Sequence, residues 1–194
     1  KIQNAAAFRK TIGLWGRADT ICFRLIHAEG DGLPGLIIDI YDQVAVVQCH
    51  SIGMYKSIPQ ISNALQQVLQ DNLKAIYIKS ASTLPSNFTS ESKDQYVFGD
   101  ASSCPCNVKE NALSFEVNWE TGQKTGFFLD QRDNRQHITQ YCNGKKVLNA
   151  FSYSGGFSVY ALKGGAQEVH SVDVSSTATS LAETNVNLND LQGK

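Results

Sequence analysis

The sequence predicts an α/β protein, and two observations carry the prediction. Along residues 147–174, a strand pattern is followed by a glycine pair, a short apolar helix pattern and a second strand that ends near Asp173. This order is typical of a βαβ nucleotide-binding unit, whose ligand lies at the carboxyl ends of the strands. Upstream, residues 22–48 alternate apolar runs with turn signals, which indicates a strand meander and therefore an α+β part before the βαβ unit.

The composition argues against several classes of protein. The 194 residues contain 17 Lys and Arg against 18 Asp and Glu, so no global positive field marks a nucleic-acid binder. Residues 1–24 and 123–146 each hold five basic groups, which allows two local positive patches or merely solvated faces. The five cysteines are scattered without CxxC pairs, which argues against a disulfide framework or a metal site and fits a reducing cytoplasm. No run has the length of a membrane span.

The first residues predict a helix. Residues 3–15 carry apolar side chains at helical spacing, namely Ala5, Phe8, Ile12 and Trp15. Because the chain opens on Lys1 and its only methionine is Met54, we expect a piece of a longer protein. In that protein, residues 1–19 would link to an upstream domain.

The next elements predict an α+β domain over residues 20–106. Residues 56–70 place apolar groups at three- and four-residue steps, with Pro59 in the first turn, so an amphipathic helix should follow the meander. Residues 75–79 predict a strand. Residues 80–106 are rich in Ser, Asn and Asp, and we expect a long disordered connection there. Its CxC motif, Cys104-Pro-Cys106, could be a redox pair or half a metal site but is more often loop sequence.

A second domain is predicted over residues 107–194. Two short strand patterns within 107–119 flank Lys-Glu-Asn-Ala and indicate a hairpin. The βαβ unit follows, and Asp173 lies eighteen residues beyond Gly155, close to the roughly twenty at which a carboxylate binds ribose hydroxyls. A tight turn and a helix cap are the plainer explanations of these two residues. Ser175 should begin a helix over 175–189, with Asn185 and Asn189 one turn apart.

Residues 123–135 are the other informative run. Asp130 could cap a helix whose first turns hold Arg132 and Arg135, three residues apart on one face. Such a face could bind a carboxylate or a phosphate. An ordinary solvated helix start is the alternative.

Three ordered motifs together resemble the RlmI/YccW family of S-adenosylmethionine-dependent 23S ribosomal RNA methyltransferases. They read Lys124-Thr-Gly-Phe-Phe-Leu-Asp-Gln-Arg-Asp-Asn-Arg135, Val147-Leu-Asn-Ala-Phe-Ser-Tyr-Ser-Gly-Gly-Phe157 and Val172-Asp-Val-Ser175. The run from Phe23 to Leu36 extends the similarity, which covers nearly the whole chain apart from residues 80–106.

The resemblance implies an order of domains and a set of site residues. The family has an amino-terminal PUA RNA-binding domain, a central α+β domain and a class I (Rossmann-like) methyltransferase fold, of which this chain resembles the central domain and a truncated last one. S-adenosyl-L-methionine is the implied cofactor. Implied cofactor residues are Asn149, Phe151, Ser152, Tyr153, Ser154, Gly155, Gly156, Asp173, Ser175, Phe128 and Arg132, and implied RNA contacts are Lys124 and Arg135. Tyr153 stands where related enzymes often have glycine.

The resemblance also implies the reaction. The family methylates carbon 5 of a cytosine in large-subunit ribosomal RNA, which requires a cysteine thiolate to add at carbon 6. The family's Pro-Pro loop and catalytic cysteine would lie beyond Lys194, so no catalytic residue is assigned and this piece should be inactive alone. A non-catalytic RNA-binding or assembly module and a nicotinamide dehydrogenase are the alternatives. We further expect a cytoplasmic protein, no membrane partner, and a homodimer through the exposed sheet edge.

Overall fold

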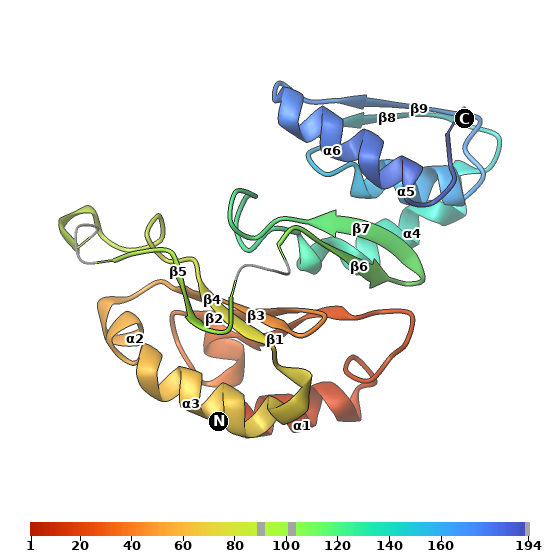
Figure 1. Cartoon of the computed structure of the whole chain (residues 1–194). Coiled ribbons are helices and arrows are strands. Elements are labelled where there is room, and N and C mark those ends of the chain that lie inside the picture. The colour runs from red at the N-terminus through yellow and green to blue at the C-terminus, as the bar shows by residue number, and fades with distance from the viewer. Residues whose placement is uncertain (89–91, 101–103, 193–194) are drawn as a thin grey trace. The chain divides into compact units, whose positions relative to one another are not determined.

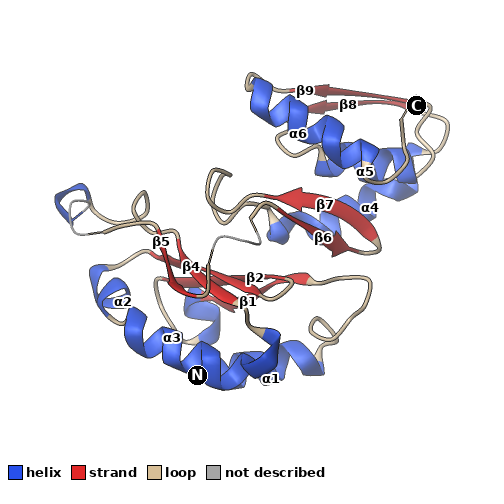
Figure 2. Ribbon diagram, viewed as in Figure 1, coloured by secondary structure: helices blue, strands red, loops and turns tan. Residues whose placement is uncertain are grey.

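The computed structural model describes residues 1–88, 92–100 and 104–192, in two compact units (Figures 1 and 2). Unit 1 comprises residues 1–108 and 117–127, and unit 2 comprises residues 109–116 and 128–194. The predicted three-part division into 1–19, 20–106 and 107–194 remains a prediction about the roles of these segments. Among the described residues, no helix combines the length and apolar character needed to cross a membrane.

Unit 1 is built on a five-stranded sheet in the order β1-β2-β3-β4-β5. The strands are β1 (Cys22–His27), β2 (Leu36–Tyr41), β3 (Val44–Cys49), β4 (Ala75–Ile78) and β5 (Gln95–Phe98). The first three pair antiparallel, which confirms the predicted meander, and β4 joins β3 in parallel. A parallel step needs a crossover, which the helices α2 (Ile52–Lys56) and α3 (Ile58–Leu69) supply together with η2 (Gln70–Asn72).

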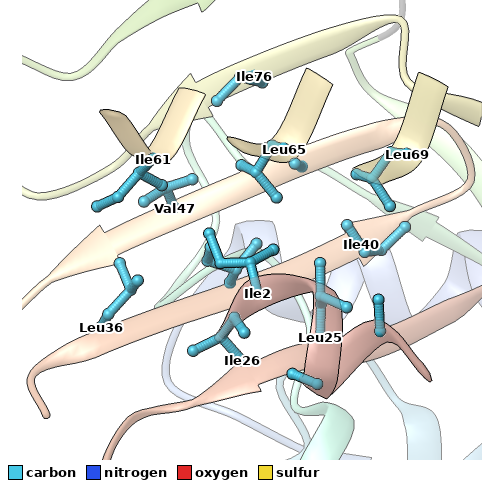
Figure 3. Close-up of a cluster of buried hydrophobic side chains, with 14 of the residues drawn as sticks. Ile2, Leu25, Ile26, Leu36, Ile40, Val47, Ile61, Leu65, Leu69 and Ile76 are labelled. Carbon is cyan, nitrogen blue, oxygen red and sulfur yellow. The ribbon is translucent and has the colours of Figure 1, made fainter. Parts of the chain in front are cut away.

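The core of unit 1 lies between its sheet and the helices α1 (Ile2–Thr11) and α3 (Figure 3). α3 buries Ile61, Leu65 and Leu69 at successive four-residue steps, which confirms the predicted amphipathic helix. Each such aliphatic side chain contributes about 1.5–3 kcal/mol when it leaves water. The sheet side of the core comes from alternate residues of the strands, such as Leu36, Ile38 and Ile40.

The first helix differs from its prediction. It ends at Thr11, and Gly13 follows with a left-handed φ of 67°. The buried residues are Ile2, Ala5, Ala6 and Arg9, whereas Phe8 and Ile12, predicted on the buried face, are 55% and 54% exposed. α1 therefore packs into unit 1 through small side chains and one arginine.

Arginines in the first 24 residues are neutralised by aspartates. Arg9 makes a two-pronged contact with Asp31 of η1 (Ala28–Asp31) and also donates to the Arg24 carbonyl. Arg17 pairs with Asp19, and Arg24 pairs with the buried Asp39. The three arginines thus carry their own counter-charges, so a positive patch in this stretch would depend on Lys1 and Lys10.

The predicted disordered connection is partly ordered. Residues 86–88 form the short helix η3 (Ser86–Phe88), and β5 pairs antiparallel with β4. The Asp94 carboxylate accepts hydrogen bonds from the backbone amides of Ser80 and Ala81, which holds the residue before β5 at the end of β4. Residues 89–91 and 101–103, on which the rest of the prediction falls, lie outside the described residues.

Buried polar side chains of the sheet hold residues 117–127 within unit 1. Lys79 donates from Nζ to the carbonyl groups of Trp119 and Gly122, and burial lowers the pKa of this lysine. The Thr125 hydroxyl donates to Asp39 over 2.6 Å and shares a hydrogen bond with the Tyr41 hydroxyl. Because buried polar groups need hydrogen-bond partners, these contacts fix the start of the segment that carries the Lys124 motif.

The predicted hairpin is present as β6 (Cys106–Glu110) and β7 (Leu113–Val117). Its two turn residues, Asn111 and Ala112, both have left-handed φ values, 50° and 64°. Two successive left-handed residues are the conformation that matches the twist of paired strands.

Unit 2 contains the predicted βαβ unit. β8 (Lys146–Ala150) and β9 (Glu168–Val172) are parallel, with Leu148 opposite His170, and α5 (Gly156–Lys163) connects them. Helices α4 (Arg132–Cys142) and α6 (Ser176–Asn187) complete the unit. On one sheet face Leu148 and Val172 are 69% and 55% exposed, and the predicted homodimer contact at this sheet remains a prediction.

The start of α4 differs from the prediction that Asp130 caps this helix. Residues 129–131 form the short helix η5 (Leu129–Gln131), and α4 begins after Gln131 without a side-chain cap. Asp130 instead accepts a hydrogen bond from the Gln131 side chain. The chain therefore winds into α4 through a tighter turn, and Asp130 does not cap the helix.

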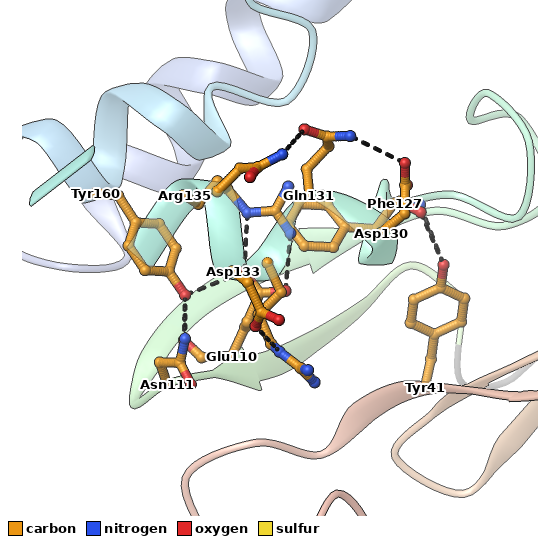
Figure 4. Close-up of polar contacts among 11 residues, drawn as sticks. Tyr41, Glu110, Asn111, Phe127, Asp130, Gln131, Asp133, Arg135 and Tyr160 are labelled. Atoms are coloured by element: carbon orange, nitrogen blue, oxygen red, sulfur yellow. Dashed lines mark hydrogen bonds and ion pairs between the residues drawn. The ribbon is translucent and has the colours of Figure 1, made fainter. Parts of the chain in front are cut away.

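A buried ion pair joins three elements of unit 2 (Figure 4). Arg135 of α4 donates from Nε and Nη2 to the two carboxylate oxygens of Glu110, over 2.9 and 2.8 Å. The Tyr160 hydroxyl of α5 donates to the same carboxylate over 3.1 Å and accepts from the Asn111 side chain. Burial and the neighbouring Glu110 raise the pKa of Tyr160, so its hydroxyl stays a donor. The prediction that Arg135 contacts RNA is therefore wrong, because its guanidinium is buried inside unit 2 and bound to Glu110.

Replacing Arg135 with alanine is expected to lower the free energy of unfolding by about 3–5 kcal/mol, because Glu110 would remain as an unpaired buried charge. Urea denaturation measures this energy. The matched control is Arg132→Ala on the same helix, since Arg132 pairs with Asp133, whose side chain is 88% exposed, and surface pairs contribute about 0–1 kcal/mol. Equal losses in the two variants would contradict a special role for the buried pair.

Candidate functional site

The candidate site lies at the carboxyl ends of β8 and β9, where residues 151–156 lead from β8 into α5. The Ser152 amide donates to the Val172 carbonyl over 3.1 Å, which holds this loop against the end of β9. The Gly155 amide turns back to the Ser152 carbonyl over 2.8 Å, and Gly155 then precedes the first residue of α5. The amino end of α5, with its unpaired amides and positive dipole end, thus opens directly from the loop.

The loop backbone is left-handed at three alternate residues. Phe151, Tyr153 and Gly155 have φ values of 57°, 44° and 68°. Glycine adopts such a conformation freely, whereas each non-glycine residue in it costs about 1–2 kcal/mol. The sequence placed Tyr153 where related enzymes often have glycine, and its backbone adopts the glycine-like conformation nonetheless. Strain concentrated in so short a segment is typical of a functional site.

Asp173 stabilises the strained loop. Its Oδ2 accepts from the Tyr153 amide over 2.9 Å, and its Oδ1 accepts from the Ser175 amide over 3.0 Å. These two hydrogen bonds, that of Ser175 first, lower the pKa of Asp173, so the group is ionised at neutral pH. Each carboxylate oxygen can accept a further hydrogen bond. Asp173 therefore holds the loop, meets the start of α6 and retains acceptor capacity, whereas Ser175 itself caps α6 by accepting from the Ala178 amide.

Asn149 lies under the loop in a chain of polar side chains. Its Nδ2 donates to the Ser158 hydroxyl over 2.8 Å, and Ser158 shares a hydrogen bond with Ser171 over 2.7 Å. The chain runs from β8 through α5 to β9. It fixes the carboxamide of Asn149 near the carboxyl end of its strand.

Ser152 carries the feature that most directly indicates a ligand. The residue is 7% exposed, and its hydroxyl has no hydrogen-bond partner among the described residues. A buried hydroxyl without a partner costs about 1–3 kcal/mol. A small polar group bound in the loop would satisfy it, so the residues present fit a ligand that carries amino, carboxylate or hydroxyl groups.

Of the other predicted site residues, some lie at the loop and others lie away from it. Phe128 packs edge-on against Tyr153, with ring centroids 5.4 Å apart, so it lies beside the loop, and its contact with the cofactor stays a prediction. Arg132 pairs with Asp133 on the surface of α4. Ser154 and Gly156 lie in the loop, and Lys124 belongs to unit 1, outside this site within unit 2.

Helix α6 closes the site from a side that the sequence did not indicate. A Cβ atom added at Gly155 would lie 2.7 Å from the Cβ of Ala182. One turn further, the Asn185 side chain donates to the Ser154 carbonyl over 2.7 Å. The four-residue spacing of Asn185 and Asn189 was visible in the sequence, but their partners lie far away along the chain.

Comparison of the sequence with known proteins identifies the family of the chain. A family model described as S-adenosylmethionine-dependent methyltransferase matches residues 23–193. Ribosomal RNA large subunit methyltransferase I of Aeromonas salmonicida is 42% identical over 169 residues, which cover 87% of this chain and 42% of that protein. Across the first curated relatives, this chain spans between 42% and 48% of their length.

Solved structures agree with this assignment. A structure from Streptococcus mutans, described as a S-adenosylmethionine-dependent methyltransferase, has a TM-score of 0.85 at 29% identity, over 98% of this chain and 48% of that chain. A second methyltransferase structure, complexed with S-adenosylhomocysteine, has the same TM-score and identity over 98% of this chain and 47% of that one. The predicted α/β fold and the family resemblance are thereby confirmed. The chain belongs to the family of S-adenosylmethionine-dependent methyltransferases.

Proposed function

We propose that residues 151–156 together with Asp173 bind S-adenosylmethionine, and that the protein containing this chain methylates large-subunit ribosomal RNA. The observation that carries the proposal is the ionised Asp173 carboxylate bonded to the Tyr153 amide at the mouth of a loop that ends in a left-handed glycine. A carboxylate after the second strand and a glycine turn after the first are the two parts that an adenosine-containing ligand requires.

Each part of the site has a chemical role in this proposal. Asp173 accepts hydrogen bonds from the ribose hydroxyls with its remaining lone pairs. The Ser152 hydroxyl and the amino end of α5 bind the amino and carboxylate groups of the methionine part, with Asn149 beneath them. Phe128 packs beside Tyr153 at the same end, and Arg132 and Ser175 are weaker candidates for contact. When bound, the cofactor supplies a methyl group on a positively charged sulfur.

Ribosomal RNA is the proposed substrate because relatives at 42% identity are named as large-subunit methyltransferases. Lys124 remains a candidate for contact with the RNA. A protein of that kind would act in the cytoplasm, where ribosomes are assembled. Since this chain spans about half the length of those relatives, the activity is proposed for the protein that contains it.

The proposed target atom is carbon 5 of a cytosine, and the thiols of this chain bear on the nucleophile that such a reaction requires. A thiolate, not a thiol, adds to carbon 6 of the ring. Burial raises the pKa of Cys49 to about 11 and that of Cys106 to about 12, and it also raises the pKa values of Cys104 and Cys142. Cys22 is buried in the core of unit 1. These thiols are poor nucleophiles, so we propose that the reactive cysteine belongs to another part of the protein.

Asp173→Asn is expected to weaken the binding of S-adenosylhomocysteine by about 10- to 100-fold, since hydrogen bonds to a charged acceptor contribute about 1.5–3 kcal/mol. Isothermal titration calorimetry with the 194-residue chain measures the dissociation constant. Asp133→Asn is the control, because the side chain of this aspartate is 88% exposed and pairs with Arg132. Unchanged affinity in Asp173→Asn would show that this carboxylate does not bind the ligand. Binding of NADH in place of S-adenosylhomocysteine would favour the dehydrogenase alternative.

The pH dependence of binding has a defined sign. Backbone hydrogen bonds hold the pKa of Asp173 below its ordinary value of 3.8, so its contribution is complete at neutral pH and is lost as the pH falls through the lowered value. Titrations between about pH 8 and pH 5 should therefore show no step from this group. A step in that range that disappears in Asp173→Asn would show that the carboxylate is not ionised as described.

Gly155→Ala is expected to destabilise the chain and weaken cofactor binding, because the new Cβ would lie 2.7 Å from that of Ala182. Overpacking of this kind costs about 1–3 kcal/mol beyond the backbone strain. Gly144→Ala is the matched control, since Gly144 has the same φ of 68° and nothing within 4 Å of the added atom. Ala182→Gly should restore part of the loss in the double variant. Equal unfolding energies for Gly155→Ala and Gly144→Ala would show that the contact with α6 is unimportant.

A further inference from the structure

We infer that Asn185 is a positioning residue for the cofactor loop: its carboxamide connects the Ser154 carbonyl to strand β7 and thereby sets the turn in which the ligand is bound. The inference rests on the proposed function, because it assigns a role at the same site. It concerns a residue whose carboxamide is bonded to backbone groups of the loop and of β7. All of its contacts lie within unit 2.

Asn185 is wholly buried, and both ends of its carboxamide are used. Its Nδ2 donates to the Ser154 carbonyl over 2.7 Å, and its Oδ1 accepts from the Glu116 amide over 2.8 Å. The side chain thus occupies the place of a peptide group between a strand and a loop that do not pair directly. A carboxamide offers a donor and an acceptor together, whereas an ionised aspartate has no donor and a leucine has neither.

The Ser154 carbonyl is the point at which the loop conformation is decided. Because the peptide bond is planar, fixing this carbonyl also fixes the direction of the Gly155 amide, which donates to the Ser152 carbonyl. Gly155 then adopts its left-handed φ of 68° and opens α5. Ala182, three residues before Asn185, contacts the same glycine position. Helix α6 therefore holds the turn by one hydrogen bond and one close packing contact.

Asn189 provides an internal comparison. It lies one turn beyond Asn185 and binds the same strand, accepting from the Ser114 amide and donating to the Ser114 carbonyl over 2.8 and 2.7 Å. It also donates to the Asn185 carbonyl, and its side-chain hydrogen bonds within the described part of the chain go to β7 and α6 and not to the loop. The two asparagines share their chemistry and their partner strand, and they differ in the bond to Ser154.

The test compares Asn185→Asp with Asn189→Asp, and Asn185→Ala with Asn189→Ala as a pair that buries no charge. Hydrogen exchange of the free 194-residue chain is measured first. Asn185 variants should raise the exchange rates of the Tyr153 and Gly155 amides about 10-fold, whereas Asn189 variants should raise that of Ser114 and leave the loop unchanged. Titration with S-adenosylhomocysteine should then show about 10-fold weaker binding for the Asn185 variants and less than about 2-fold for the Asn189 variants.

Three outcomes separate the possibilities. Equal effects of the two asparagines on loop exchange and affinity, at equal losses of stability, would overturn the inference and leave a merely structural role for both. Failure of the unaltered chain to bind S-adenosylhomocysteine would overturn the proposed function, while the exchange rates would still decide whether Asn185 holds the loop. Loop-specific exchange together with a selective loss of affinity would support both.

Discussion

The buried contact between Arg135 and Glu110 is the constraint on which unit 2 depends. Removing two charges from water is unfavourable unless each finds its partner in good geometry, and here the guanidinium binds both carboxylate oxygens while Tyr160 donates to one of them. The contact thereby ties the β6-β7 hairpin to α4 and α5. A Cβ atom on Gly156 would lie 3.0 Å from the Arg135 side chain, so the ion pair also lies directly beneath the first residue of α5.

The loop of residues 151–156, which leads into α5, has a strained backbone, and three hydrogen-bond partners hold it in place. Asp173 binds the Tyr153 amide, the Val172 carbonyl binds the Ser152 amide, and Asn185 binds the Ser154 carbonyl. These partners come from the end of β9, the residue after it and α6, which are themselves ordered by the parallel sheet. Protein groups thus hold the loop backbone in place, and the Ser152 hydroxyl is the buried polar atom of its interior that has no partner among the described residues.

Local patterns in the sequence were sufficient for the βαβ unit, for α3 and for the position of Asp173 just after the second strand, because these depend on residue order and spacing along one segment. They could not distinguish Arg132 from Arg135, which are three residues apart on one helix. Arg135 faces Glu110, 25 residues earlier in the chain, and Arg132 faces its exposed neighbour Asp133. Asn185 was missed for the same reason, since 31 residues separate it from Ser154. For α1, helical spacing favoured the large side chains of Phe8 and Ile12, but the close approach of the helix to the sheet selected Ala5 and Ala6 instead.

The distribution of positive charge limits how this chain could contribute to RNA binding. All five arginines are paired with carboxylates, namely Arg9, Arg17, Arg24, Arg132 and Arg135. Arginine is the residue whose planar fork reads guanine edges and binds phosphate with two hydrogen bonds, and here those forks are occupied. The charge that remains lies on lysines, and the contacts that lysines make with phosphates as point charges carry no sequence information. Under the proposed function, the chain would therefore attract and orient the RNA backbone near the cofactor, and its arginines would not select the base.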